Sequence, residues 1–207
     1  MQRSEYYNQL KTLASEIRSQ YNLVSPRVLR SDLRRIYRDQ GITIDLWPQK
    51  LRHLRGAYIN DEHGTTVMLA KGLPEDPMVF TMAHELKHHL ADADLSLSYC
   101  DLSNEREPIE IGAEVFAAEL IYPEQTFASD IAEFGATPGR CSPEMLVRLK
   151  HLTRTTMSYT GLVKRAVFMG FATSPDQYRG VKWKRLEEQM FGVPLYKRLL
   201  RSRNTVA

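Results

Sequence analysis

The segment Thr81–Asp92 most strongly limits what this chain can fold into, because it carries an H-E-x-x-H pattern made of His84, Glu85 and His88. A helix has about 3.6 residues per turn, so the two histidines lie one turn apart on nearly the same face and can bind one metal ion. Glu85 lies roughly 100° further round the helix, beside such an ion rather than on it. The pattern therefore predicts a zinc site with Glu85 as the general base that removes a proton from water.

The residues around this pattern favour a helix with one buried side. Pro77 lies near a first turn that also contains Glu75 and Asp76, which is a common place for proline in a helix. Apolar residues follow along the segment at helical spacing: Val79, Phe80, Met82, Ala83, Leu86 and Leu90. We therefore predict that this helix packs on the protein and carries the metal site.

A second helix is predicted within residues 105–123, where apolar residues recur at helical spacing and Pro123 ends the pattern. Glu110 and Glu114 lie one turn apart in it. A zinc peptidase with two histidine ligands takes a third, carboxylate ligand from a second helix and leaves the fourth position to water. It also needs an acid that accepts the other ring N–H of a ligand histidine. Glu110 and Glu114 have the spacing for these two roles; the alternative is that both are surface acids.

The order of predicted elements indicates an α+β fold that is mostly helical. We expect helices over Glu5–Gln20 and from a Ser31 cap to Gly41, then a small antiparallel sheet beside the metal helix. Its strands are expected over residues 42–47, 56–61 and 65–70, with a hairpin turn at residues 62–64. Residues 1–135 would form a metallopeptidase-like domain, and residues 136–207 a helical C-terminal region opened by a helix at Ser142-Pro143.

Composition indicates a soluble protein. None of the 207 residues belongs to an apolar run near the roughly 20 residues of a membrane span. The charged N-terminus lacks the apolar core of an export signal, so we expect a cytoplasmic protein. The 2 cysteines are too few for a disulfide framework.

Charge is distributed unevenly along the chain although the net charge is only +3. Basic residues outnumber acidic ones near both ends, and acidic residues dominate between Asn60 and Glu133. An acidic surface around the metal would favour a basic substrate such as a DNA-binding protein. Solvated helix faces with an incidental bias are the alternative.

Two runs of residues resemble one known family. Phe80–His88 is similar to the F-T-x-A-H-E-L-x-H core of the ImmA/IrrE zinc metallo-endopeptidases, and Glu110–Pro123 is similar to their E-x-E-A-N-x-F-A-A-x-L-L-M-P segment. The resemblance implies that His84, His88 and Glu110 hold Zn²⁺ and that Glu85 is the general base. Glu114 stands where the family usually has Asn or Asp. Gly112 replaces a common Glu, a change that we expect to be neutral.

Family members of this type cleave helix-turn-helix repressor proteins in bacteria and mobile elements, and thereby relieve repression of stress-response or transfer genes. The resemblance implies that this chain does the same. The alternative is a metal-containing regulatory binding protein that sequesters a repressor or DNA without cleaving it. Candidates for a second donor to the oxyanion are Tyr99, His89 and Tyr122, among which the sequence does not select.

The C-terminal region carries two further alternatives. Residues 156–165 resemble the helix that follows the family's catalytic region and have helix-turn-helix character, so they form either a DNA-reading element or a small packing module. From Tyr178 onward, an apolar stripe with a basic polar side predicts a helix that packs on the protein, pairs two chains or contacts nucleic acid.

Overall fold

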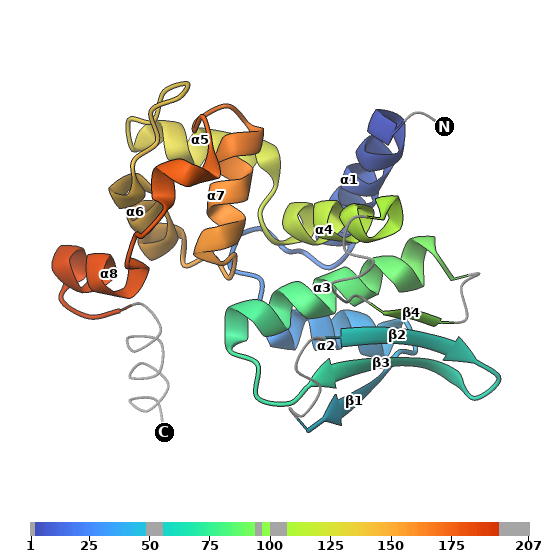
Figure 1. Cartoon of the computed structure of the whole chain (residues 1–207). Helices are drawn as coiled ribbons and strands as arrows, with labels where there is room; N and C mark the ends of the chain where they lie inside the picture. The colour runs from blue at the N-terminus through green and yellow to red at the C-terminus, as the bar shows by residue number, and fades with distance from the viewer. Residues whose placement is uncertain (1–2, 49–55, 94–96, 100–106, 195–207) are drawn as a thin grey trace. The chain divides into compact units, whose positions relative to one another are not determined.

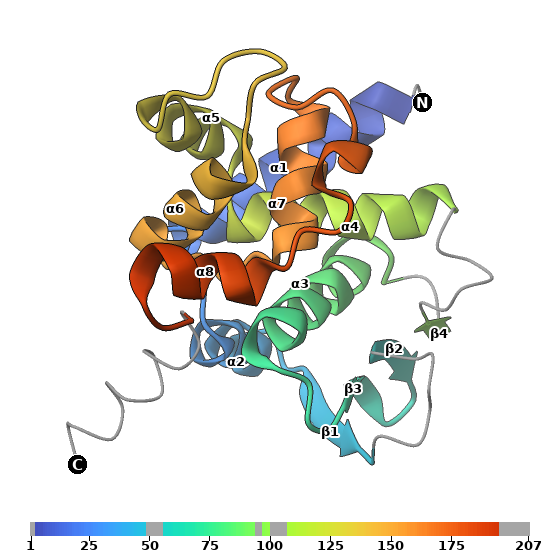
Figure 2. The same cartoon turned by 60° about the vertical axis from the view of Figure 1, so that its left-hand side comes forward.

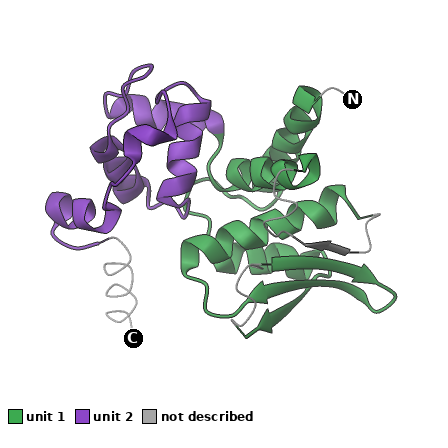
Figure 3. Cartoon of the chain, viewed as in Figure 1, with its two compact units in different colours: residues 1–123 green, residues 124–207 purple. Residues whose placement is uncertain are grey.

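The computed structural model describes residues 3–48, 56–93, 97–99 and 107–194 of the chain. Its contacts divide the chain into two compact units, residues 1–123 (unit 1) and residues 124–207 (unit 2), which Figure 3 colours separately. The division falls at the start of helix α5 (Glu124–Glu133), before the boundary after residue 135 that the sequence predicts. Helix α5 belongs to unit 2 because the Phe127 ring packs on Phe171, with ring centroids 6.4 Å apart, and Glu124 pairs with Arg165 at 3.0 Å.

Unit 1 combines helices with one small sheet, as the α+β prediction requires (Figure 1). The described residues of the unit form helices α1 (Arg3–Gln20), α2 (Arg30–Asp39), α3 (Glu75–Ala91) and α4 (Pro108–Ile121), and strands β1 (Thr43–Trp47), β2 (Gly56–Asp61), β3 (Gly64–Ala70) and β4 (Leu97–Tyr99).

The sheet is mixed, which differs from the expected antiparallel arrangement. Its strand order is β1-β3-β2-β4, and β2 pairs antiparallel with both β3 and β4. Strand β1 instead pairs in parallel with β3. The predicted β2–β3 hairpin is confirmed: the Asp61 carboxylate accepts the backbone N–H of His63 at 2.9 Å, and Gly64 takes a φ of +108°. The sequence pattern of β1 indicates a strand but carries no information on its direction.

Helix α3 is held between the sheet and the other helices of unit 1 (Figures 1 and 2). The hydroxyl of Tyr37 on α2 donates a hydrogen bond to the backbone carbonyl of Met82 on α3 at 2.7 Å. Helix α1 packs along α4, where the Arg18 guanidinium donates to the Leu120 carbonyl at 2.6 Å. This contact satisfies a carbonyl at the helix end, which has no partner within the helix. The helix that carries the histidines is therefore fixed from several sides.

Helix α2 begins at Arg30, two residues before the start that a Ser31 cap predicts. Leu29, rather than Ser31, is its N-cap residue, and the Asp32 carboxylate accepts the Leu29 backbone N–H at 2.8 Å. Ser31 lies exposed inside the first turn. The acid at the third helical position closes the turn, so no capping hydroxyl is needed.

Unit 2 is helical in its described residues, with α5 followed by α6 (Pro143–Thr153), α7 (Tyr159–Phe168), a short 3₁₀ helix (Pro175–Tyr178) and α8 (Trp183–Phe191). The predicted start of α6 is confirmed, because the Ser142 hydroxyl accepts the Met145 backbone N–H. The C-terminal segment from residue 195, part of the predicted basic tail, lies outside the described residues. None of the described helices combines the length and apolar character that a membrane crossing requires.

Candidate metal centre

Helix α3 presents both histidines of the H-E-x-x-H pattern on its buried side. His84 is 5% exposed and His88 is fully buried, and their ring centroids lie 5.2 Å apart. The spacing of four residues produces this proximity, since it returns the second side chain to nearly the same helix face. The predicted pairing of the two rings is present in the fold.

Helix α4 brings Glu110 to the same point. Pro108 begins the helix, which places Glu110 in the first turn. The Glu110 Oε2 atom lies 3.0 Å from His84 Nε2, and its Oε1 atom lies 3.7 Å from His88 Nε2. One potential ligand atom from each of the three residues lies within 4.8 Å of the others, which makes the group a candidate metal site.

The hydrogen bonding of the two His88 ring nitrogens is that expected of a metal ligand. Its Nε2 atom is buried and has no hydrogen-bond partner, while its Nδ1 atom lies 2.8 Å from the Asp92 carboxylate. A buried nitrogen that lacks a partner is costly unless something binds it. Two imidazoles and one carboxylate are the protein ligands of many catalytic zinc sites, so the donor set fits this metal.

The charges of the centre perturb one another strongly. Burial alone would raise the pKa of Glu110, but the imidazoles of His84 and His88 outweigh it and lower that pKa. Burial alone would lower the pKa of His88, but the carboxylates of Asp92 and Glu110 outweigh it and raise that pKa to about 9. Without a metal, the centre thus favours a proton on His88 and an ionised Glu110, and a cation bound there would take the place of that proton.

Glu85 lies next to the centre and is 1% exposed. Burial raises its pKa to about 7, the repulsion of Glu110 adds to this rise, and the two histidines oppose it. Its carboxylate lies against the start of β2: a Cβ atom on Gly56 would be 2.6 Å from Glu85 Oε1 and equally close to Thr81 Cγ2. The glycine at the start of β2 therefore leaves the room that the carboxylate occupies.

Two contacts near the centre were not anticipated from the sequence. Asp92 supplies the carboxylate for His88 Nδ1, a role that the sequence pattern assigns to Glu110 or Glu114. The signal was available, because Asp92 follows His88 by four residues. Glu114 is half-buried on α4, and its role stays a prediction. Gly112 lies against α1, because a Cβ atom there would be 2.8 Å from the Tyr6 hydroxyl. The neutral effect expected for this glycine stays a prediction.

The candidates for a second oxyanion donor differ in position. Tyr122 is fully buried just after the C-terminal end of α4. At a rise of about 1.5 Å per residue, that position lies roughly 18 Å along α4 from Glu110, too far to reach the same centre. His89 packs edge-on against the Tyr58 ring, with centroids 6.0 Å apart. The side chain of Tyr99 lies outside the described residues.

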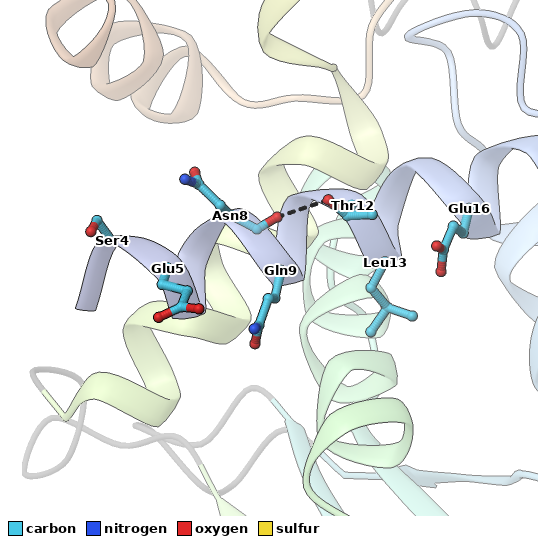
Figure 4. Close-up of a pocket in the computed structure, with 7 residues that line it drawn as sticks. All are labelled: Ser4, Glu5, Asn8, Gln9, Thr12, Leu13 and Glu16. Carbon is cyan, nitrogen blue, oxygen red and sulfur yellow. Dashed lines mark hydrogen bonds between the residues drawn. The ribbon is translucent and has the colours of Figure 1, made fainter. Parts of the chain in front are cut away.

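A shallow hollow follows the polar face of α1 and is separate in its residues from the centre (Figure 4). The Thr12 hydroxyl donates to the Asn8 carbonyl within it at 3.1 Å, an ordinary contact within a helix. The hollow is lined by Ser4, Glu5, Asn8, Gln9, Thr12, Leu13 and Glu16.

Comparison with known proteins places this centre in a family. No curated protein matches the chain. The model of a peptidase family, the IrrE N-terminal-like domain, matches residues 38–140. These residues contain His84, Glu85, His88 and Glu110. This span includes the sheet and the two helices that build the centre. The resemblance inferred from the two sequence motifs is thereby confirmed, and the chain belongs to the family of peptidases with an IrrE N-terminal-like domain.

Proposed function

We propose that this protein is a zinc-dependent endopeptidase that cleaves a helix-turn-helix transcriptional repressor and so relieves repression. The observation that carries the proposal is the convergence of His84, His88 and Glu110 within 4.8 Å, beside a buried Glu85. A purely structural zinc site is normally closed by a fourth protein ligand and needs no free acid next to it. Among the residues that the structure describes, the candidate ligands number three, and Glu85 adds the acid that hydrolysis requires.

Glu85 has the properties of a general base in this site. A zinc ion bound there supplies Lewis-acid chemistry, which polarises a peptide carbonyl and makes water easier to deprotonate. Glu85 accepts the proton and then donates it to the amine that leaves. A carboxylate whose pKa lies at about 7 suits both steps, because it exchanges protons readily near neutral pH. The buried surroundings of Glu85 strengthen its interaction with any charge that develops.

The repressor is proposed as substrate on two grounds. The family resemblance of the two motifs implies this class of substrate, and the acidic middle of the chain favours a basic partner, as DNA-binding proteins are. The control of stress-response or mobile-element genes follows from such a substrate. DNA itself is a second candidate partner, through the basic residues near the C-terminus.

The test is the substitution Glu85→Gln in the full-length protein. We expect the variant to keep one zinc ion per chain and to lose cleavage by roughly 10²–10⁴-fold, the usual contribution of a general base. Glu62→Gln is the matched control, because the Glu62 side chain is 87% exposed on the β2–β3 hairpin. Elemental analysis reports the zinc content, and intact-mass spectrometry reports cleavage of purified helix-turn-helix repressors from the source organism.

The outcomes separate the two candidate functions. Cleavage that survives Glu85→Gln would contradict the general base. A protein that holds zinc and binds a repressor but cleaves none of those offered would instead be a metal-containing regulatory binding protein.

A further inference from the structure

Lys87 is a fully buried lysine inside the H-E-x-x-H pattern, next to the metal-binding His88. Burying an ammonium group without partners costs several kcal/mol, so its contacts have to account for its position. Its Nζ atom lies 2.5 Å from Asp92 Oδ2 and 3.1 Å from the backbone carbonyl of Ile109 at the start of α4. It also lies 5.7 Å from the centre of the Tyr6 ring, within the range of a cation–π interaction.

The Tyr6 ring reaches Lys87 because α4 carries a glycine where the two helices meet. A Cβ atom on Gly112 would be 2.8 Å from the Tyr6 hydroxyl and 2.9 Å from Leu10 Cδ1. Helix α1 can therefore approach α4 closely at this point. The ammonium of Lys87 thus has partners from α1, from α4 and from the residue that follows α3.

One carboxylate oxygen connects this lysine to the metal centre. Asp92 Oδ2 lies within hydrogen-bond distance of both Lys87 Nζ and His88 Nδ1, at 2.5 Å and 2.8 Å. The Asp92 side chain is only 9% exposed, so its charge needs compensation, which the ammonium supplies. A carboxylate held in this way fixes the ring orientation of His88 and leaves its Nε2 atom directed at Glu110.

We propose that Lys87 is a positioning residue for the metal centre: it holds Asp92 against His88 Nδ1 and so orients the metal-binding nitrogen of His88. The proposal rests on the metal centre of the proposed function. It adds Lys87, Asp92 and the Tyr6 ring to the groups that determine zinc affinity, although none of them would contact the ion.

The first test compares two buried lysines. In the full-length protein, Lys87→Met should weaken zinc binding by about 10–100-fold, the usual effect of losing a group that supports a metal ligand. Lys150→Met is the matched control. Lys150, in unit 2, is also buried, donates to the carbonyls of Thr155 and Met157, and lies 5.6 Å from a tyrosine ring. Its loss should leave zinc affinity unchanged. Competition with a chromophoric zinc chelator gives the affinities.

A double-mutant cycle separates positioning from general stabilisation. If Lys87 acts through Asp92, then Asp92→Asn should weaken zinc binding. The double variant Lys87→Met, Asp92→Asn should then bind zinc little more weakly than Asp92→Asn alone. Cobalt(II) in place of zinc adds a second readout, since its visible absorption should change in Lys87→Met and not in Lys150→Met. Zinc affinity of Lys87→Met equal to wild type, or fully additive effects, would overturn the proposal.

Two further results keep the test decisive. If Lys87→Met does not fold, Tyr6→Leu replaces it: removal of the ring over the ammonium should weaken zinc binding several-fold, and Tyr6→Phe should not. Unchanged affinity in Tyr6→Leu would then overturn the role of Lys87. A wild-type protein that binds no zinc would refute the metal centre itself, whereas zinc binding that is indifferent to Lys87 refutes this proposal alone.

Discussion

The two units of the molecule both bury charged side chains, but they use them differently. In unit 1 the described buried histidine, lysine and glutamate side chains cluster about one point: His84, Glu85, Lys87, His88 and Glu110. In unit 2 the described buried charges include no group of three potential metal ligands, although Tyr159 contacts both Lys150 and Glu187. Lys150 donates to the carbonyls between α6 and α7, Arg165 pairs with Glu124, and Glu187 accepts a hydrogen bond from the Tyr159 hydroxyl.

The difference shows which property distinguishes a functional site from a structural contact. Burial of charge is common to both units, so it does not identify the site. Lys150 and Lys87 even share two kinds of partner, a backbone carbonyl and a tyrosine ring. What unit 1 adds, among the described residues, is the convergence of potential metal ligands: one carboxylate joins Lys87 to His88, and His88 faces Glu110. Substitutions in the two units should therefore have separable effects on metal binding and on folding.

The largest difference in zinc affinity is expected between the alanine variants of two buried glutamates. Glu110→Ala removes a proposed zinc ligand and should weaken zinc binding by on the order of 10³-fold or more, beyond the loss typical of a supporting residue. Glu187→Ala removes a buried acid of unit 2, 7% exposed, and should lower the stability of that unit without changing zinc affinity. Titration with a competing chelator measures the first effect and urea unfolding the second. Equal zinc affinity in both variants would mean that the third ligand is misassigned.

A smaller difference, in cleavage activity, is expected between alanine variants of two glycines, neither of which has a positive φ. Gly56→Ala places a methyl group 2.6 Å from Glu85 Oε1, so the carboxylate has to move. Cleavage should fall by about 10²-fold, as when a catalytic group is misplaced by 1 Å, while zinc binding stays close to wild type. Gly161→Ala on α7 places a methyl group 2.8 Å from Met157 Cγ, so it causes a similar local strain in unit 2 without touching Glu85, and cleavage should not change. A Gly56→Ala enzyme with wild-type activity would contradict the close contact with Glu85.

The sequence was most informative where a short spacing determines the geometry. The positions of His84, Glu85 and His88 follow from helical periodicity, and Glu110 followed from the resemblance of its segment. Helices α1 to α4 and the β2–β3 hairpin were predicted close to their observed bounds, because turn residues and apolar periodicity are local properties. Helix α5 and strand β4 were not predicted.

Contacts between distant segments could not be predicted in this way. The parallel pairing of β1 with β3, and the packing of Phe127 that assigns α5 to unit 2, depend on how the chain folds back on itself. The partners of Lys87 come from α1 and α4 as well as from Asp92, so no local sequence pattern predicts all of them. The closeness of Gly112 to Tyr6 could not be predicted for the same reason.

The smallest expected difference concerns how the stability of metal-free unit 1 depends on pH. The folded-state pKa of Glu85 is raised from 4.5 to about 7, so the protonated form is favoured by folding. This contribution to stability is full below pH 4.5 and is lost as the pH rises through 7. His88 acts in the same direction, because its pKa is raised from 6.5 to about 9 and its contribution is lost as the pH rises through 9. Metal-free unit 1 should therefore lose stability between pH 5 and 9.

One fluorescent reporter can follow this loss. Trp47 lies on β1 in unit 1 and Trp183 on α8 in unit 2, so Trp183→Phe leaves unit 1 with the only tryptophan of the 2 in the chain. Urea unfolding of this variant after chelator treatment should show a decrease on the order of 4 kcal/mol between pH 5 and 8, to which Glu85 and His88 contribute about equally. The same variant with Glu85→Gln should show a clearly smaller decrease, since only His88 then titrates as described. A decrease that is unchanged by Glu85→Gln would assign the pH dependence to other groups and would contradict the buried, partly protonated state of Glu85 that distinguishes this unit.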